Sequence, residues 1–428
     1  MKILIATYYW PPSGGSGVQR WMYFAKHLQS FGMEPIIVTI DPETASYNTF
    51  DESLIDEVSS IRTIHTEGGF QILKLYSFLK SGNANKKIPT GNLGSKEPSF
   101  FDKIASKVRA NYFIPDARVS WNKKALPEIQ KIIREEKIDL FITTGPPHST
   151  HLLGLAIKKS FTSIKWIADF RDPWREVYYN NLFKRSKKAD DKDAKFEKEV
   201  IEKSDLILTV GPSMAELISS KTSSPSKVKH ILNGFDASKM DGLTKQKHPG
   251  FTITHVGVWT LQQPFQEVVD ALSQLLKEHT DWKINFRLVG NVHEDIVQAL
   301  KTVKGLTVEL LGKVNHQTAL QEMMNADVLL NCLANMEQSK LLISGKLMEY
   351  LATGNNTIII GNPNGDAAHL AQPIPNAEVV SPKDSNSLKV IIEKIYLSER
   401  LDSKPHPSIF NYTRENTARE LKELIEVI

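Results

Sequence analysis

Short apolar runs alternate with amphipathic helical patterns along this chain, and this alternation constrains the fold more than any other feature. The runs typical of buried strands are Ile3–Thr7, Pro35–Ile40, Leu140–Thr143, Lys165–Ala168 and Leu206–Val210 in the first half, and Thr252–Val256, Asn285–Val289, Thr307–Leu311, Val328–Asn331 and Thr357–Ile360 in the second. Helical patterns lie between them, including Val18–Phe31, Ala125–Glu136, His151–Ser160, Asp193–Lys203, Phe265–Lys277 and His316–Met324. Strands that alternate with helices predict parallel sheets covered on both faces. We therefore predict an α/β protein with two doubly wound domains.

A polar stretch divides the chain into two halves. Residues 239–250 include Pro249 and Gly250 among polar residues, which is typical of a linker. Since 428 residues are too many for one ordinary core, we predict an N-terminal Rossmann-like domain over residues 1–240 and a C-terminal one over residues 241–410. Ligands bind beyond the carboxyl ends of the strands in such sheets, so two facing domains of this kind predict a central cleft.

The composition excludes several functional classes. The single cysteine, Cys332, cannot form an intrachain disulfide or a cysteine-based zinc site, which fits a reducing compartment. No apolar stretch approaches the ~18 residues of a membrane span, and the N-terminus is typical of a first strand and not of a secretory signal. Asp191 and Asp193 have the spacing of a metal-binding pair, but they stand in a run of alternating charges typical of an exposed helix face. We therefore expect a cytoplasmic protein without a metal site.

Positive charge is concentrated in residues 70–124, which hold 11 basic and 3 acidic residues. Hydrophobic side chains are interleaved with lysines in the first part of this stretch, residues 70–113. A basic amphipathic surface binds anionic lipid, so one interpretation is peripheral association with the inner face of the plasma membrane. The alternative is a helical face that packs on its own domain.

Residues 339–354 carry the most informative side chains. Lys346 and Glu349 are three residues apart in a short helical pattern, so they share one face of the helix. Gly345 lets backbone amides approach a ligand closely, and Gly354 suits the left-handed conformation that ends a helix. An ammonium and a carboxylate in this arrangement favour a nucleoside diphosphate, with Lys346 on the phosphates and Glu349 on the ribose hydroxyls. The alternative is a solvent-exposed Lys–Glu pair.

A glycine-rich loop follows the first strand. Gly14, Gly15 and Gly17 allow a tight turn with free amides at a helix start. The loop departs from the dinucleotide fingerprint, because Arg20 stands at the third glycine position, and it lacks the lysine of a P-loop. It therefore predicts either a phosphate contact or a plain structural turn.

Polar side chains crowd two other loops of the first half. His148 follows the strand at 140–143, a position suited to polar chemistry at the edge of a parallel sheet. The strand at 165–168 is followed by a loop that holds Asp169, Arg171, Asp172 and Trp174. Either aspartate would orient a hydroxyl or act as a base. The alternative is an Arg–Asp pair that fixes the loop.

In their order, these motifs resemble the retaining nucleotide-sugar glycosyltransferases of family 4, which have the GT-B fold. The resemblance extends over nearly the whole chain through PPSGGSGVQR at 11–20, TGPPHSTH at 144–151, DFRDPW at 169–174, KSDLILTVGPSMAEL at 203–217, ILNGFD at 231–236, HVGVW at 255–259, FRLVGN at 286–291, LLGKVNHQTALQEMMNADVLLN at 310–331 and SGKLMEYLATG at 344–354. The form of DFRDPW and SGKLMEYLATG is similar to that in bacterial enzymes of capsule, O-antigen (lipopolysaccharide) or exopolysaccharide assembly.

The resemblance implies a transferase of the hexosyltransferase type, with a final helix at 411–428 that crosses back to the first domain. It implies a donor site formed by Gly14, Gly15, Gly257, Trp259, Ser344, Gly345, Lys346 and Glu349. The catalytic residues that it implies are His148, with His151 as the less favoured alternative, Asp172 and Lys346. The residues that it implies on the acceptor side are Asp169, Arg171 and Trp174.

The same resemblance implies the partners and cofactors. The donor would be a nucleoside diphosphate sugar, and the acceptor a lipid-linked molecule or a saccharide. Lys346 would neutralise the diphosphate leaving group, so that neither a metal nor another cofactor is needed. A nucleic-acid partner is not expected, since the basic stretch lacks a known docking motif.

Two positions depart from the family pattern. Leu341 stands eight residues before Glu349, where the family often has an acid that contacts the transferred sugar. The family also often carries Arg and Lys after the first strand of the second domain, where this chain has Trp259, Gln262 and Gln263. These departures suggest one alternative, a non-catalytic scaffold of a polysaccharide assembly complex. A second alternative is a sugar-nucleotide epimerase of the GT-B fold, which also uses two such domains.

Overall fold

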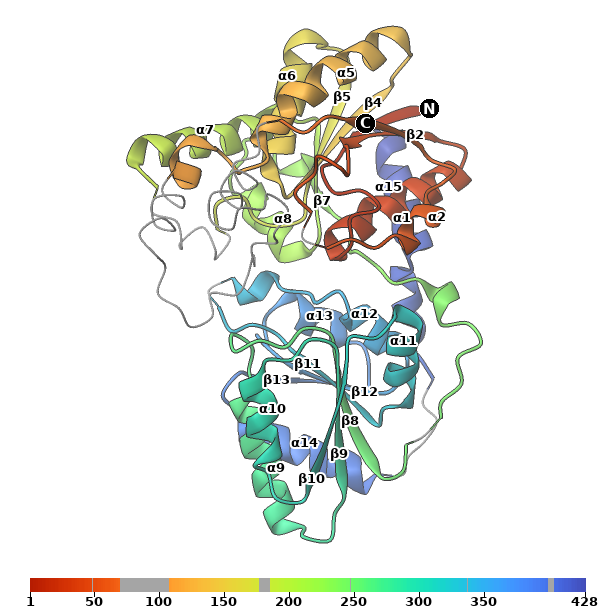
Figure 1. Cartoon of the computed structure of the whole chain (residues 1–428), viewed down its shortest axis with the longest axis vertical. Coiled ribbons are helices and arrows are strands. Elements are labelled where there is room, and N and C mark those ends of the chain that lie inside the picture. Colours follow the sequence, from red (N-terminus) through yellow and green to blue (C-terminus); the bar gives the residue numbers. More distant parts are fainter. Residues whose placement is uncertain (48, 70–107, 177–184, 247, 337, 399–403) are drawn as a thin grey trace. The chain divides into compact units, whose positions relative to one another are not determined.

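The computed structural model describes the chain except for residues 48, 70–107, 177–184, 247, 337 and 399–403. The described residues divide into two compact units: unit 1 consists of Met1–Leu232 and Ala418–Ile428, and unit 2 of Asn233–Thr417. Each unit is built on its own parallel sheet with helices around it (Figure 1), as the alternating pattern predicts. The units meet in the sequence at residues 232 and 417, where the pattern predicted 240 and 410.

Unit 1 has a seven-stranded parallel sheet in the order β3-β2-β1-β4-β5-β6-β7. Its strands are β1 (Lys2–Ala6), β2 (Glu34–Ile40), β3 (Arg62–Thr66), β4 (Leu140–Gly145), β5 (Lys165–Phe170), β6 (Leu206–Thr209) and β7 (Val228–His230). Its helices include α1 (Ser16–Ser30), α2 (Ser53–Glu57), α5 (Asn122–Glu135), α6 (His151–Ser160), α7 (Lys187–Lys203) and α8 (Pro212–Ser219). The chain winds outward from β1 to β3 and then returns to β4, so the strand order reverses beside β1. Ligands bind at the carboxyl ends of the strands near such a reversal.

Unit 2 has a six-stranded parallel sheet in the order β10-β9-β8-β11-β12-β13. Its strands are β8 (Phe251–Val256), β9 (Ile284–Val289), β10 (Leu306–Gly312), β11 (Val328–Cys332), β12 (Asn356–Ile360) and β13 (Ala377–Val380). Its helices include α9 (Gln266–Glu278), α10 (Glu294–Lys301), α11 (His316–Asn325), α12 (Leu347–Ala352), α13 (Asp366–Ala371) and α14 (Ser385–Leu397). The order reverses between β8 and β11, and the two loops that follow these strands therefore lie at the expected ligand edge.

Three strands of the two sheets were not predicted. These are β3, β7 and β13, and each lies at an edge of its sheet. Their sequences, RTIHT, VKH and AEVV, contain polar residues and no continuous apolar run. The central strands lie within about two residues of the predicted ranges.

The final helix, α15 (Arg414–Glu426), belongs to both units. Its first turn lies in unit 2, where the Thr413 side chain accepts a hydrogen bond from the Asn416 amide at 3.2 Å and so caps the helix N-terminus. Its later turns bury Ala418, Leu421 and Ile425 in the hydrophobic core of unit 1. The prediction that the final helix crosses back to the first domain is therefore confirmed.

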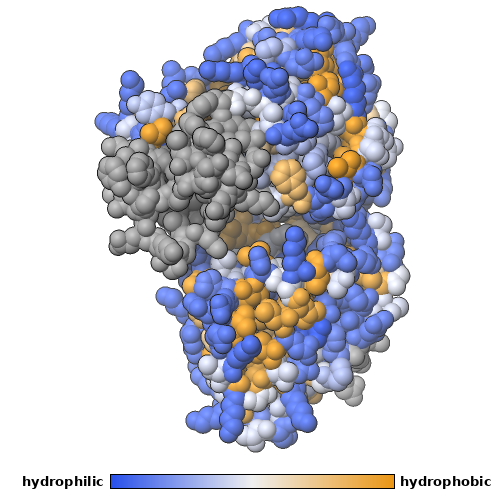
Figure 2. Space-filling view, in the orientation of Figure 1, coloured by the Kyte–Doolittle hydropathy of each residue, from blue (hydrophilic) through white to orange (hydrophobic). Residues whose placement is uncertain are grey.

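Among the described residues, no helix is both long and apolar enough to cross a bilayer. The visible face is mostly hydrophilic, with hydrophobic residues gathered on unit 2 (Figure 2). The predicted membrane-binding stretch at 70–113 falls mostly outside the described residues.

Candidate functional site

Lys346 lies at the ligand edge of unit 2 and is held there by a histidine that the sequence did not single out. Lys346 immediately precedes α12, and its Nζ lies 3.1 Å from Nε2 of His255 in β8. Nδ1 of His255 donates to the carbonyl of Leu330 at 3.1 Å, which leaves Nε2 as an acceptor for the ammonium. Burial lowers the pKa of Lys346 to about 8. Burial and the nearby Lys346 charge hold the pKa of His255 well below its usual range, so this imidazole is neutral.

Trp259 supports His255 from behind and does not face a ligand. Its indole is fully buried and stacks on the His255 ring, with centroids 4.6 Å apart. Its Nε1–H donates to the carbonyl of Pro264 at 3.2 Å, so its polar atom is already used. The expected donor contact of Trp259 is therefore corrected to a packing role that positions His255.

Two glycines at this edge leave space near Lys346. Gly257 has a φ of +114°, and a Cβ there would lie 3.5 Å from Nζ of Lys346. Gly345 is exposed, and no atom lies within 4 Å of the position a Cβ would take. The turn after α12 closes at Gly354 with a φ of +73°, as the sequence predicted.

Ser344 connects the segment before α12 to the end of β11. Its hydroxyl donates to Oδ1 of Asn331 at 3.0 Å. Asn331 is fully buried, and its Nδ2 has no hydrogen-bond partner among the described residues. An unpaired amide donor is costly to bury, so this group is suited to a ligand oxygen.

Glu349 lies in α12, and a second unforeseen histidine contacts it. Nε2 of His316, the first residue of α11, lies 2.9 Å from Oε1 of Glu349. The Glu349 side chain is 13% exposed and that of His316 is 43% exposed. Lys346 and Glu349 do not pair with each other within the described part of the chain, because each has a histidine partner instead. The surface Lys–Glu pair, which the sequence left as an alternative, is therefore wrong.

Asp169 occupies the interior of unit 1 and not its surface. Its carboxylate accepts hydrogen bonds from Arg20 at 3.1 Å, from Trp21 at 2.7 Å and from Thr144 at 2.8 Å. The side chains of Arg20 and Asp169 are 2% and 0% exposed. These donors join α1, β4 and β5, so the expected acceptor contact of Asp169 is corrected to a buried structural ion pair.

Arg171 ties three backbone segments together at the ligand edge of unit 1. Its guanidinium donates to the carbonyls of Gly145, Pro146 and Gly17. Burial lowers its pKa, although the charges of the neighbouring aspartates oppose this effect.

Gly14 lies in the glycine-rich loop between β1 and α1. Its amide donates to the carbonyl of Thr49 at 2.9 Å. This amide is therefore not available to the phosphate contact that the sequence predicted.

His148 and Trp174 stack on each other, with ring centroids 4.9 Å apart and an interplanar angle of 13°. Trp174 is buried and its Nε1–H donates to Asp193 at 2.9 Å, so the expected acceptor contact of Trp174 is corrected to a core contact. Burial lowers the pKa of His148 to about 3. Its Nε2 lies 3.2 Å from the carbonyl of Pro173, while its Nδ1 has no partner among the described residues. His148 is therefore a neutral hydrogen-bond acceptor.

His151, the alternative to His148, is fully buried in the same stack. Its Nδ1 lies 2.9 Å from the hydroxyl of Thr143, and its ring stacks on Phe170 with centroids 4.7 Å apart. Its Nε2 is also without a partner in the described part of the chain. Both unpaired histidine nitrogens approach Gly145, where a Cβ would lie 2.7 Å from Nε2 of His151 and 3.0 Å from Nδ1 of His148.

Asp172 is the acid of this loop that remains available. Burial raises the pKa of its carboxyl group. No hydrogen bond or ion pair is assigned to it within the residues that the structure describes.

Asp193 in α7 is buried and accepts hydrogen bonds from Trp174 and Arg185. The interpretation of Asp193 as part of an exposed face is therefore wrong, and the described residues contain no cluster of three or more potential metal ligands.

The architecture is shared with solved structures over the full length of the chain. Anabaena HepE in complex with UDP and glucose is 13% identical, with a TM-score of 0.61 and 100% of both chains covered. Sucrose-phosphate synthase from Thermosynechococcus elongatus is 15% identical, with a TM-score of 0.63, 100% of this chain and 98% of that chain. The lipopolysaccharide outer core galactosyltransferase WaaB in its apo form is 12% identical, with a TM-score of 0.59, 100% of this chain and 99% of that chain. This chain has the GT-B fold.

The sequence itself carries a family match within this GT-B architecture. Residues 93–239 match the family model described as Glycosyltransferase Family 4. No curated protein sequence matches the chain. The resemblance to a family 4 glycosyltransferase of the GT-B fold is thus supported by a match to one part of the sequence and by the fold of the whole.

Proposed function

We propose that this protein is a retaining, metal-independent glycosyltransferase. It moves a sugar from a nucleoside diphosphate sugar to a hydroxyl of a lipid-linked or saccharide acceptor in bacterial surface polysaccharide synthesis. The observation that carries this proposal is the Lys346 ammonium at the ligand edge of unit 2. It is held by a neutral histidine and has no carboxylate partner among the described residues.

A cation of this kind is suited to the leaving group of sugar transfer. As the bond between the sugar and the diphosphate breaks, negative charge develops on the phosphate oxygen, and a fixed ammonium stabilises that charge. Because His255 is neutral, it orients Lys346 without adding a charge of its own. In the described structure no carboxylate competes for the ammonium, so its charge remains available to the phosphates.

Glu349 is the proposed partner of the ribose hydroxyls. His316 contacts Oε1, which leaves the second carboxylate oxygen to accept hydrogen bonds from the sugar. Asn331 offers an unpaired amide donor on the neighbouring strand end. On this proposal Leu341 contributes no polar contact, and the transferred sugar is held by backbone groups and by Asn331.

The comparisons add support for the chemistry. HepE was crystallised with UDP and glucose, and WaaB is named as a galactosyltransferase of the lipopolysaccharide outer core. Both share the fold of this chain at low sequence identity, so they support the substrate class and leave the sugar and the acceptor open.

The test compares Lys346→Ala with the wild-type protein in sugar transfer and in UDP binding. We expect Lys346→Ala to lose most of its turnover, since removing a preorganised charge contact costs about 100- to 1000-fold. Lys301→Ala, which changes an exposed lysine of α10 in the same unit, is the matched control and keeps full activity. Near-normal sugar transfer by Lys346→Ala would contradict the proposed role of Lys346 and the glycosyltransferase function that rests on it.

Product analysis addresses the finer parts of the proposal. The anomeric configuration of the product, read by NMR, must equal that of the donor if the enzyme retains configuration. Transfer must persist after exhaustive treatment with EDTA if no metal is needed.

Flotation with anionic and neutral vesicles tests peripheral membrane association through residues 70–113. If the protein floats with neither kind of vesicle, this association is rejected.

A further inference from the structure

The two histidines that follow β4 each bury one nitrogen that has no hydrogen-bond partner among the described residues. These nitrogens are Nδ1 of His148 and Nε2 of His151. Both lie beside Gly145, where a Cβ would be 3.0 Å from the first and 2.7 Å from the second. The two ring centroids are 5.9 Å apart, and the rings are tilted by only 30°. A buried donor or acceptor without a partner is costly, so the two nitrogens call for a common explanation.

The unpaired nitrogen of His148 is a hydrogen-bond acceptor. Its other nitrogen, Nε2, lies 3.2 Å from the carbonyl of Pro173. A carbonyl oxygen only accepts, so Nε2 carries a proton and donates it there. Burial lowers the pKa of His148 to about 3, so the ring is neutral and has a single N–H. Nδ1 is therefore a buried lone pair that lacks a donor.

The unpaired nitrogen of His151 is a hydrogen-bond donor. The hydroxyl of Thr143 accepts from Nε1–H of Trp166 at 2.9 Å and lies 2.9 Å from Nδ1 of His151. No other partner is assigned to this hydroxyl in the described structure, so its one proton goes to Nδ1. Burial holds the pKa of His151 well below its usual range, and the neutral ring then carries its proton on Nε2.

The two unpaired nitrogens are therefore complementary, because one has a proton and the other has a lone pair. A hydrogen bond between them, direct or through one water molecule, satisfies both. It also completes a chain in which each group donates to the next, from Trp166 through Thr143, His151 and His148 to the carbonyl of Pro173. Hydrogen bonds in such a chain strengthen one another in a buried environment.

We propose that His151 is a positioning residue that donates from Nε2 to Nδ1 of His148 and leaves Nε2–H as the only polar group that His148 offers to a substrate. On the proposed glycosyltransferase function, on which this inference rests, His148 contacts the substrate through this N–H. His148 then acts by donating a hydrogen bond to a sugar oxygen. It is not the general base that takes the proton of the acceptor hydroxyl, because its second nitrogen is occupied.

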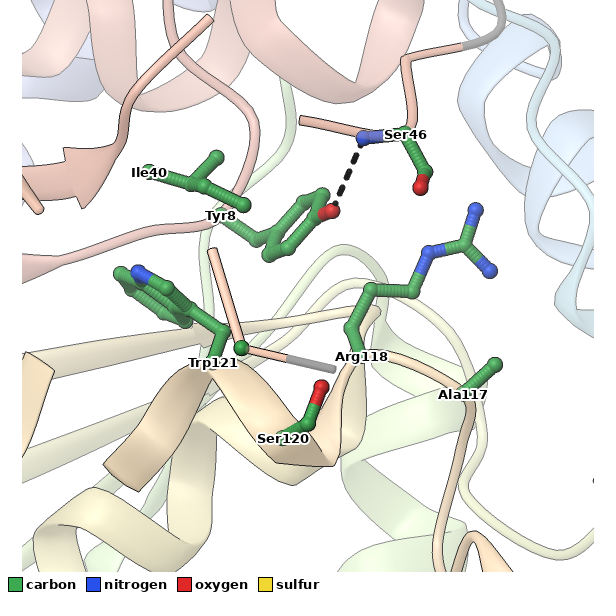
Figure 3. Close-up of a pocket in the computed structure, with 8 residues that line it drawn as sticks. Tyr8, Ile40, Ser46, Ala117, Arg118, Ser120 and Trp121 are labelled. Carbon is green, nitrogen blue, oxygen red and sulfur yellow. Dashed lines mark hydrogen bonds between the residues drawn. The ribbon is translucent and has the colours of Figure 1, made fainter. Parts of the chain in front are cut away.

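The segment that leads into α5 holds the turn between the two histidines. Asp116 accepts hydrogen bonds from the amide and the hydroxyl of Ser149, both at 2.8 Å, and Asn122 donates to the carbonyl of Ser149 at 2.6 Å. Residues of the same segment, Trp121 among them, line a small pocket together with Tyr8 (Figure 3). Neither histidine lines this pocket, so it does not open onto their nitrogens.

The spectroscopic test follows the imidazole nitrogens in full-length protein labelled with ¹⁵N-histidine. The signals are assigned by their loss in His148→Gln and His151→Phe. We expect wild-type His148 to carry its proton on Nε2 and to show the shift of a hydrogen-bonded acceptor at Nδ1. His151→Phe keeps a ring and removes the donor, so the Nδ1 signal should move to the position of a free acceptor. His65→Phe makes the same change at an exposed position of β3 and should leave the signal unchanged.

Two further signals separate a direct hydrogen bond from a water bridge. A scalar coupling between Nε2 of His151 and Nδ1 of His148 identifies the direct bond, and an NOE from the His151 N–H to water identifies the bridge. Either result supports the proposal. A proton on Nδ1 of His148 in wild type, or an Nδ1 signal that is the same in wild type and His151→Phe, would overturn it.

The kinetic test asks whether His148 acts as a donor or as a base. His148→Gln keeps an N–H donor and cannot act as a base, whereas His148→Phe keeps a ring and loses both functions. We expect the kcat of His148→Gln to stay at least about tenfold above that of His148→Phe, because one hydrogen bond is retained. Equal inactivity of the two variants would show that donation alone is not the role of His148, and would contradict the proposal.

His151 itself should affect kcat and not the KM for the donor, since Lys346 and Glu349 lie in unit 2. We expect His151→Phe to lower kcat about tenfold. His151→Gln restores an N–H donor at this position and should recover most of that loss, which a purely structural role of the ring would not predict. The same kcat for His151→Gln and His151→Phe would count against the proposed hydrogen bond.

UDP binding to wild type, measured by calorimetry, reports on the proposed function separately. If the ¹⁵N signals show the His151–His148 hydrogen bond while UDP does not bind, the hydrogen-bond chain stands and the glycosyltransferase assignment falls. If UDP binds and Nδ1 of His148 has the shift of a free acceptor in wild type, the glycosyltransferase assignment stands and the positioning role of His151 is rejected.

Discussion

A single ammonium group, that of Lys346, carries the positive charge at the proposed donor site. Burial disfavours the charged form and lowers the pKa of Lys346 to about 8. The group loses its proton as the pH rises through this value, and only the protonated form attracts phosphates. Its charge is therefore present at neutral pH and disappears in the mildly alkaline range.

Donor kcat/KM should consequently fall about tenfold per pH unit above a pH of about 8, since this parameter reports the free enzyme. Lys346→Arg should remove this alkaline limb, because arginine keeps its proton throughout the range. A pH profile of wild type beside Lys346→Arg and the control Lys301→Arg measures this. An identical alkaline limb in wild type and Lys346→Arg would assign the limb to another group.

Asp169 and Asp172 are three residues apart, but only Asp169 belongs to a buried ion pair. Asp169→Asn breaks the buried pair with Arg20 and should lower the free energy of unfolding by about 3 to 5 kcal/mol. Asp172→Asn removes a carboxylate to which no partner is assigned among the described residues, and should change stability by less than about 0.5 kcal/mol. Denaturant unfolding of the two variants makes the comparison. Equal losses of stability would contradict the structural role given to Asp169.

At the scale of elements, the sequence predicted the strands that are buried on both faces. Ile3, Leu4 and Ile5 of β1 are fully buried, and such continuous apolar runs are a direct signal of a central parallel strand. β3 reads RTIHT, and its arginine and histidine are exposed, so it has no such signal. Edge strands are bonded on one side only, and their existence depends on a neighbouring strand that is distant in the sequence.

The site was predictable only where its residues are neighbours in the sequence. Lys346 and Glu349 are close enough for helical spacing to place them on one face. His255 lies 91 residues before Lys346 and His316 lies 33 residues before Glu349, so no local pattern connects either pair.

The loop after β9 supports the loop after β8 by close backbone contact. Gly290 has a φ of +110°, and a Cβ there would lie 2.4 Å from the carbonyl oxygen of Gly257. Gly290→Ala should therefore displace Gly257 beside Lys346 and cost about 2 to 4 kcal/mol of stability, with weaker UDP binding. Gly312→Ala also has a positive φ but no atom within 4 Å, and should cost only about 1 kcal/mol. Equal unfolding free energies and equal UDP affinities for the two variants would contradict this contact.

At the scale of the whole molecule, the core of unit 1 includes residues from the last turns of α15. Leu421 is fully buried in a core that also contains Trp21 and Phe24 of α1. Leu421→Ala should destabilise unit 1 by about 2 to 5 kcal/mol, because it leaves a cavity. Val427→Ala, at a site that is 81% exposed, is the control and should change stability by less than about 0.5 kcal/mol. Hydrogen exchange read by mass spectrometry should locate the loss of protection in unit 1 and not in unit 2.

The chain enters unit 2 and leaves it at adjoining points. The amide of Phe235 donates to the carbonyl of Tyr412 at 3.1 Å, and the amide of Arg414 donates to the carbonyl of Phe235 at 2.8 Å. During ribosomal synthesis, unit 2 is therefore complete while unit 1 still lacks its last helical turns. Unit 1, which is made first, therefore has part of its core uncovered until residues 418–428 of α15 have been made. Premature termination within α15 would thus harm the N-terminal unit and spare the one next to the stop.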